Sequence, residues 1–224
     1  MSSKLIGKNS MSQEKNIYIL SDKKVANTIN LPMIEISYLP FEIDFSQYEA
    51  LVFTSRNAIK SINSFSNGWK KIPSYVIAPQ TAKTLEKLGG TLQYVGENGH
   101  GNDFAKEIEC QLQGKKVLYL CGKKVVSNLF GILNDSGVLC EKAVVYETIC
   151  KEYAEKLTLP KNSIIIFSSP STLECFFKNI SSWDTSYTAI SIGKTTAQYF
   201  PKNITPLIPN QTSLDACVEI ALGI

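Results

Sequence analysis

The chain has 224 residues, 44% of them hydrophobic, and its 23 basic and 20 acidic residues give a formal net charge of +3. This length allows one large domain or two of about 110 residues. No apolar run approaches the roughly 20 residues that a membrane-spanning helix needs, and the charge is too small to indicate nucleic acid. We therefore expect no membrane span and no nucleic-acid partner, although the charge would tolerate an anionic small molecule.

The N-terminal segment and the cysteines concern the location of the protein. Residues 1–15 are polar and carry lysines with no apolar stretch behind them, which is unlike a secretory signal, so we expect a cytoplasmic protein. The six cysteines have no CxxC or other paired spacing, which argues against a disulfide framework and against a zinc site. We expect them to be small, buried residues in a reducing compartment. They are Cys110, Cys121, Cys140, Cys150, Cys175 and Cys217.

Short apolar runs, each followed by a polar turn and a helix-like stretch, recur along the whole chain. In chain order they are 17–20, 51–53, 75–78, 117–120, 164–167 and 189–192. This alternation is typical of a mostly parallel sheet covered by helices. The pattern predicts an α/β fold.

Parts of the sequence occur twice. The segment LVFTSRNA at 51–58 parallels IIFSSPST at 165–172, which begins 114 residues later, and IAPQTA at 77–82 parallels IGKTTA at 192–197, 115 residues later. Nearly equal offsets at two separate places indicate a tandem duplication. A third echo, between 17–25 and 118–126, has an offset of about 101 residues, which indicates that the first βα unit was exchanged between the copies.

The changed offset predicts interleaved domains. We place the first domain at residues 1–36 plus 150–224 and the second at 37–149. The chain then crosses twice, at 34–40 and at 144–150, and both segments are β-prone. We expect these segments to pair as a two-stranded β hinge, with the chemistry in the cleft between the two copies.

Hydroxyl residues follow the strand in all four duplicated units, where a helix is expected to begin. They are Thr54 and Ser55, Thr81, Ser168 and Ser169 before Pro170, and Thr195 and Thr196. Taken singly, each is explained as an N-cap that satisfies free backbone N–H groups. Taken together they lie at the carboxyl edge of a parallel sheet, where α/β proteins bind ligands and helix N-termini attract carboxylates or phosphates. We therefore predict a site for an anionic ligand.

Three other residues are candidates, each with a structural alternative. Arg56 and Lys194 lie in these turns and either add charge to the site or remain solvated surface. Tyr146 lies in the second crossing, where its phenol either donates a hydrogen bond in the cleft or packs in the hinge. The sequence has no GxxxxGK[ST], GxGxxG or GxSxG motif, which disfavours nucleotide-driven, nicotinamide and hydrolase chemistry.

Residues 15–222 resemble the uroporphyrinogen-III synthases. The motifs that carry the resemblance are, in order, VFTSRNA at 52–58, TA at 81–82, VYET at 145–148, FSSPS at 167–171 and IGKTTA at 192–197. The resemblance implies two flavodoxin-like α/β domains with parallel sheets, joined by a β-ladder. Residues 1–14 fall outside it, and we expect them to be a disordered extension. Where many members have Arg-Gly after the strand at 117–120, this chain has Cys121-Gly122 followed by Lys123 and Lys124, which leaves open which cation meets the substrate there.

The resemblance also implies an activity. Members are lyases (hydro-lyases) of porphyrin and heme biosynthesis, which take the linear tetrapyrrole hydroxymethylbilane, eliminate its hydroxyl as water and close the ring with the last pyrrole inverted. Such a protein needs no cofactor and no metal, and we expect a monomer. Tyr146 would be catalytic by donating a hydrogen bond to the departing hydroxyl. The substrate-binding residues would be Thr54, Ser55, Arg56, Thr81, Ser169, Ser171, Gly193, Lys194, Thr195 and Thr196.

A second function remains open at this point. A non-catalytic, two-lobed protein that closes on a small anion would use the same sheet edges and would also have two crossings. Periplasmic proteins of that kind carry an export signal, which we do not find in this sequence.

Overall fold

The computed structural model describes residues 15–21 and 23–224, which form two compact units. Unit 1 comprises the described residues up to Glu35 together with Cys150–Ile224, and unit 2 is Ile36–Ile149. The extension expected at 1–14 lies outside the described residues. Within them, no helix is long and apolar enough to cross a membrane. Both units have an α/β fold, as the alternation of apolar runs predicts.

Unit 2 is built on a sheet with the strand order β3-β8-β7-β4-β5-β6, in which β8 through β6 run parallel. Its strands are β3 (Ile34–Tyr38), β4 (Ala50–Phe53), β5 (Ser74–Val76), β6 (Leu92–Val95), β7 (Lys116–Gly122) and β8 (Leu139–Cys150). The chain places β5 and β6 on one side of β4, and β7 and β8 on the other. The direction of winding therefore reverses between β4 and β7.

Side chains of these strands alternate between two apolar layers. Leu51 and Phe53 pack with residues of α1 and α2, whereas Val52 packs with residues of α3 and α4. These elements are α1 (Arg56–Phe65), α2 (Pro79–Lys87), α3 (Gly101–Leu112) and α4 (Leu129–Asp135), and the 3-10 turn η1 (Phe45–Gln47) precedes β4. Because the sheet is covered on both faces, its central strands are continuous apolar runs rather than alternating ones.

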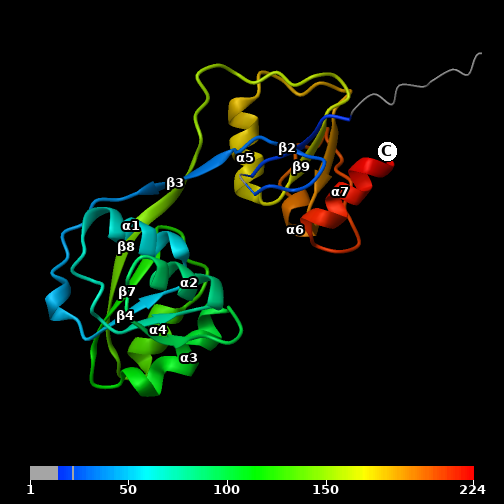
Figure 1. Cartoon of the computed structure of the whole chain (residues 1–224). Helices are drawn as coiled ribbons and strands as arrows, with labels where there is room; N and C mark the ends of the chain where they lie inside the picture. Colours follow the sequence, from blue (N-terminus) through cyan, green and yellow to red (C-terminus); the bar gives the residue numbers. More distant parts are fainter. Residues whose placement is uncertain (1–14, 22) are drawn as a thin grey trace, which may run out of the picture. The chain divides into compact units, whose positions relative to one another are not determined.

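Unit 1 has a parallel sheet with the order β10-β9-β1-β2. Its strands are β1 (Ile17–Ile19), β2 (Ile29–Asn30), β9 (Ile164–Phe167) and β10 (Thr188–Ser191), and its helices are α5 (Pro170–Asn179), α6 (Lys194–Ala197) and α7 (Leu214–Gly223). The N-terminal strands are blue in Figure 1; β1 pairs with β9 from the C-terminal third of the chain, and β2 pairs with the other edge of β1. One face of β9 packs with α5 and the other with α7.

The two sheets have the same spatial order when the sequence repeats are matched. The repeats pair β4 with β9, β5 with β10 and β7 with β1. The matched strands are ordered β10-β9-β1 in unit 1 and β5-β4-β7 in unit 2. However, β1 begins the chain of unit 1, whereas β7 comes after β4, β5 and β6 in unit 2. This permutation explains why the third repeat has a different offset from the other two.

The chain passes between the units within β3, at Glu35/Ile36, and at the end of β8, at Ile149/Cys150. From the sequence we expected these two boundaries to lie between residues 36 and 37 and between residues 149 and 150. In unit 2 the Leu39 amide donates to the Val145 carbonyl, and in unit 1 the Lys151 amide donates to the Met33 carbonyl, each at 2.9 Å. From Met33 to Leu39 the residue number rises, whereas its partner's number falls from 151 to 145, so β3 is antiparallel to β8.

A disulfide joins Cys150, at the end of β8, to Cys175 in α5. The expectation of reduced cysteines is therefore wrong for this pair, and the expectation of burial is wrong for Cys110, which is exposed. The two bonded residues are 25 positions apart, and the fold brings their Cα atoms to 5.2 Å. Spacing along the sequence contains no sign of this approach, because it depends on where α5 packs.

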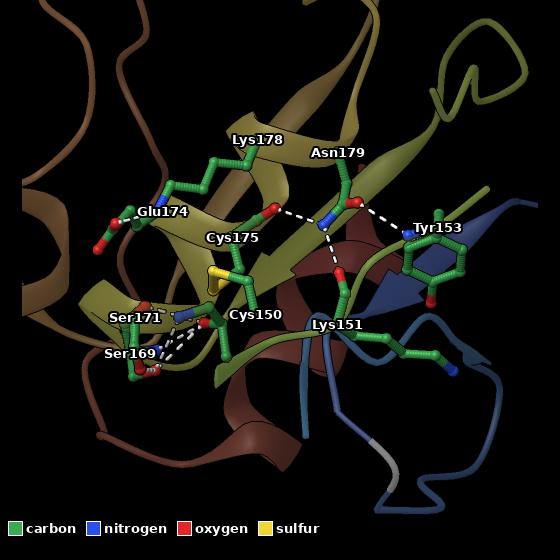
Figure 2. Close-up of a disulfide and its surroundings, with 10 residues drawn as sticks. Cys150, Lys151, Tyr153, Ser169, Ser171, Glu174, Cys175, Lys178 and Asn179 are labelled. Atoms are coloured by element: carbon green, nitrogen blue, oxygen red, sulfur yellow. Dashed lines mark hydrogen bonds and ion pairs between the residues drawn. A yellow bond between two sulfur atoms is a disulfide. The ribbon is translucent and has the colours of Figure 1, made fainter. Parts of the chain in front are cut away.

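Buried Asn179 also connects the chain after β8 to α5 by hydrogen bonds (Figure 2). Its Nδ2 donates to the carbonyls of Lys151 and Cys175, both at 2.9 Å, and its Oδ1 accepts from the Tyr153 amide at 3.3 Å. The strand that leaves unit 2 is thus held to α5 by a covalent bond and by a hydrogen-bonded amide.

We predict that Cys175→Ser lowers the free energy of unfolding by about 3 kcal/mol in urea without reductant, because the unfolded chain loses a cross-link that closes a loop of 25 residues. Cys110→Ser, at an exposed free cysteine, is the control and should leave stability unchanged. Alkylation of the unfolded, unreduced protein should modify the four free cysteines alone. Modification of all six would contradict the disulfide.

Candidate functional site

A pocket of about 270 Å³ opens at the carboxyl edge of the sheet of unit 2. It lies where β4 and β7 end, and the reversal of winding between such strands is the usual ligand position in open α/β sheets. The pocket is lined by Thr54, Ser55, Ile77, Gly101, Gly122, Lys124, Val125, Val126, Ser127 and Tyr146. Three residues predicted from separate parts of the sequence, Thr54, Ser55 and Tyr146, thus lie around one pocket.

The electrostatics of this pocket favour an anion. Ser55 is the N-cap of α1, where its hydroxyl accepts from the Asn57 amide at 3.1 Å, and Gly101 is the first residue of α3. Helix N-termini carry partial positive charge. Of the described residues that line the pocket, Lys124 is the only charged one. A carboxylate entering here meets positive charge and no opposing acid from the lining.

Thr54 is positioned by a buried tyrosine. Its hydroxyl lies 3.0 Å from the hydroxyl of Tyr119, a residue of β7 whose side chain is 1% exposed. Burial raises the pKa of Tyr119 to about 12, so its phenol keeps its proton at neutral pH. The contact between the two hydroxyls fixes the position of Thr54 in the pocket lining. The sequence did not indicate Tyr119 as its partner.

Tyr146 stands over Gly122. A β-bulge between Cys121 and Gly122 brings Gly122 opposite Tyr146, and the Lys123 amide donates to the Tyr146 carbonyl at 2.9 Å. A Cβ added to Gly122 would lie 2.7 Å from the ring carbon that bears the Tyr146 hydroxyl and 2.9 Å from the hydroxyl itself. Gly122 therefore leaves the space that this ring occupies. Tyr146 is partly buried and lines the pocket, so its phenol is available to a ligand.

The other two candidates of unit 2 differ in exposure. Arg56 begins α1 and is exposed. Thr81 was expected to cap α2, and this is wrong: Ala78 is the N-cap, Pro79 takes the first helical position, and Thr81 lies inside the first turn with 5% exposure. The helix begins earlier because the fixed φ of Pro79 suits its first turn. Thr81 consequently offers little hydroxyl surface to a ligand.

In unit 1 the cap at α5 is confirmed. Ser169 forms a capping box with Thr172, and its Oγ lies 3.0 Å from that of Ser171. Both hydroxyls are partly exposed at the carboxyl end of β9. Ser168, just before them, is partly exposed as well.

The cap expected at Thr195 and Thr196 is wrong. Gly193 is the N-cap of the short α6, and no side chain caps this helix. Lys194 and Thr195 are exposed, whereas Thr196 has 4% exposure. The helix begins at Lys194, directly after an extended glycine, so both threonines fall inside the helix rather than before it. Gly193, Lys194 and Thr195 remain accessible at the end of β10.

No group of three or more His, Cys, Asp or Glu side chains suited to a metal occurs among the residues that the structure describes. The one histidine, His100, precedes α3 as its N-cap residue and is exposed. Its side chain makes no capping hydrogen bond.

Fold and pocket together define an α/β protein with a pocket at the edge of a doubly wound sheet, bordered by two helix N-termini and Lys124. The family model for uroporphyrinogen-III synthase HemD matches residues 20–219. The crystal structure of uroporphyrinogen-III synthetase from Helicobacter pylori 26695 is 33% identical with a TM-score of 0.71, over 93% of this chain and 99% of that chain. The chain belongs to the uroporphyrinogen-III synthase family, whose members are lyase-type enzymes of tetrapyrrole biosynthesis.

Another similar structure is the wild-type uroporphyrinogen III synthase from the extremely thermophilic bacterium Thermus thermophilus. It is 12% identical with a TM-score of 0.44, over 93% of this chain and 98% of that chain. The search of curated proteins found no match.

Gly122→Ala tests whether the placement of Tyr146 matters. The added methyl group collides with the ring, so we expect the ring to move and kcat/KM for uroporphyrinogen-III formation to fall about ten- to hundredfold. The free energy of unfolding should change by about 1 kcal/mol, because the ring is the free end of its side chain. The control is Gly223→Ala, where an added Cβ meets nothing within 4 Å. Full activity in Gly122→Ala would show that this placement is unimportant.

Proposed function

We propose that this protein is a uroporphyrinogen-III synthase that converts hydroxymethylbilane to uroporphyrinogen III. The observation that carries the proposal is the pocket at the winding reversal of unit 2, where two helix N-termini, Lys124 and the Tyr146 phenol surround a space without a lining acid. The acetate and propionate groups of a tetrapyrrole suit such a lining. The family match over residues 20–219 supports the same function.

The reaction requires few catalytic groups from the protein. The electron-rich pyrrole expels the hydroxyl of the hydroxymethyl group, which leaves as water after taking up a proton. The substituted α-carbon of the last pyrrole attacks the resulting carbon electrophile and forms a spirocyclic pyrrolenine. The bond from that carbon to the neighbouring methylene bridge then breaks, and the methylene bonds to the free α-carbon of the same ring, which loses its proton, so the ring ends up inverted. We assign Tyr146 as the hydrogen-bond donor to the departing hydroxyl. The remaining catalysis is orientation, since free bilane closes without inversion.

Substrate carboxylates are held, in this proposal, at the carboxyl edge of each sheet. Unit 2 contributes Thr54, Ser55 and Arg56, and unit 1 contributes Ser169, Ser171, Gly193, Lys194 and Thr195. Backbone amides of the helix N-termini act with the hydroxyls. Thr81 and Thr196 are left out, because their exposures of 5% and 4% give a carboxylate no access.

The finer architecture belongs to the same proposal. We infer that both units derive from one flavodoxin-like domain, since the order 2-1-3-4-5 of that fold matches β2-β1-β9-β10 followed by the bridge at Leu207 in unit 1. The permuted copy in unit 2 has the same spatial order, β8-β7-β4-β5-β6. In this view β3 and β8 form the hinge. The protein acts as a cytoplasmic monomer.

The test is incubation with hydroxymethylbilane, oxidation of the products and chromatographic separation of the type I and type III isomers at initial rates. We expect type III from the wild type. Tyr146→Phe should be slower by roughly 5- to 150-fold, which corresponds to about 1 to 3 kcal/mol for one lost hydrogen bond to a leaving group.

The control for Tyr146→Phe is Tyr94→Phe, which removes the hydroxyl of a tyrosine of the same unit that contacts Glu107 at 3.3 Å outside the pocket. It should retain the wild-type rate. Formation of type I alone, at the rate without protein, would contradict the proposed function and favour a non-catalytic anion-binding protein. A full type III rate in Tyr146→Phe would show that the tyrosine is structural.

A further inference from the structure

The segment 123–127, which joins β7 to α4, forms one wall of the pocket. Four of its residues line the space: Lys124, Val125, Val126 and Ser127. Lys123 and Lys124 follow the departure from the family pattern at Cys121-Gly122, and Lys124 supplies the charge of the pocket lining, but the segment as a whole has no assigned role so far. Its side chains combine a cation with two exposed apolar groups.

The two lysines of the segment differ in their partners. The Lys123 ammonium forms an ion pair with Glu147 at 2.8 Å and does not line the pocket. Lys124 is exposed, lines the pocket and has no ion-pair partner among the described residues. Lys124 is therefore the lysine whose charge is available to an anion in the pocket.

The two valines are exposed in a way that needs explanation. Val126 has a relative exposure of 105% and Val125 of 39%, although both lie at the mouth of a pocket. Exposed valine gains about 1.5 to 3 kcal/mol from full burial. An apolar ligand surface that carries an anionic group would cover the valines and meet Lys124 at once.

The segment is tied to the start of α3. Its last residue packs so closely on Gly101 that a Cβ there would lie 2.3 Å from the Ser127 Oγ. The next residue, Asn128, donates its amide to the Asn102 Oδ1 at 2.8 Å. These contacts set the loop against the N-terminus of α3, so the lysine, the valines and the helix end border the same space.

We propose that 123–127 is a substrate-binding loop, in which Lys124 pairs with a carboxylate of the tetrapyrrole while Val125 and Val126 pack on the pyrrole ring that bears it. The inference rests on the proposed function. It adds a loop with a lysine and two valines to the helix N-termini with hydroxyl side chains that the proposed function uses. A pyrrole ring with acetate and propionate arms has both an apolar face and anionic groups, as the loop requires.

The experiment measures binding of uroporphyrin III, the stable oxidised form of the product, by fluorescence titration of the full chain. Lys124→Gln should raise Kd about five- to tenfold and reduce its dependence on salt concentration, because a charge pair is lost. Val126→Ser should raise Kd about three- to tenfold with the salt dependence unchanged. Lys142→Gln is the matched control: it removes the same charge from an exposed lysine outside the pocket, and its Kd should stay within about twofold of wild type.

Failure of the loop and failure of the function are separable when isomer formation is measured in parallel. If the wild type forms type III uroporphyrinogen and binds uroporphyrin, but Lys124→Gln and Val126→Ser bind as Lys142→Gln does, the loop assignment is overturned and the function stands. If the wild type neither forms type III nor binds uroporphyrin, the proposed function fails and the loop assignment fails with it. Both substituted positions are exposed, so the variants should unfold at the wild-type midpoint.

Discussion

Parallel pairing of β4 with β7 is the interaction on which the candidate site depends. The register runs from Ala50 opposite Val117 to Phe53 opposite Leu120, so both strands end at the same edge of the sheet. That edge receives Thr54 and Ser55 from one strand and Gly122 from the other. The strands are about 60 residues apart in sequence, and the apolar layers on both faces of the sheet hold them together. Every other part of the pocket is placed relative to this pair.

The absence of a side chain at Gly122 completes the site. The resemblance noted in the sequence leads us to expect Arg-Gly here, whereas this chain has Cys121-Gly122, with Cys121 buried in the core that faces α3 and α4. The bulge at this point turns Tyr146 toward the strand end, and the glycine gives its ring room. The positive charge of the pocket comes two residues later, from Lys124. The local departure from the family pattern is thus compatible with a cationic pocket.

Sequence periodicity predicted the sheets because strands covered on both faces must be apolar throughout, and the repeat offsets indicated the permuted copy. Capping was predicted correctly at Ser55 and Ser169, where the hydroxyl directly precedes the helix. It failed at Thr81 and Thr196, because a proline or a glycine started the helix before the hydroxyl.

The disulfide, the Tyr119–Thr54 pair and the place of Val125, Val126 and Ser127 in the pocket lining were not predictable in this way. Each depends on an approach between segments that only packing determines. For example, the separation of Cys150 and Cys175 along the sequence does not indicate that α5 packs against the end of β8.

We propose that the carboxyl edge of each sheet binds carboxylates of the tetrapyrrole. Amide hydrogen exchange with and without uroporphyrin III measures this directly, because bound carboxylates protect the N–H groups they accept from. We expect slower exchange in the first turns of α1 and α5, in separate units, and no change at η1, which precedes β4 at the opposite edge of its sheet. Protection confined to one unit, or centred on η1, would contradict this proposal.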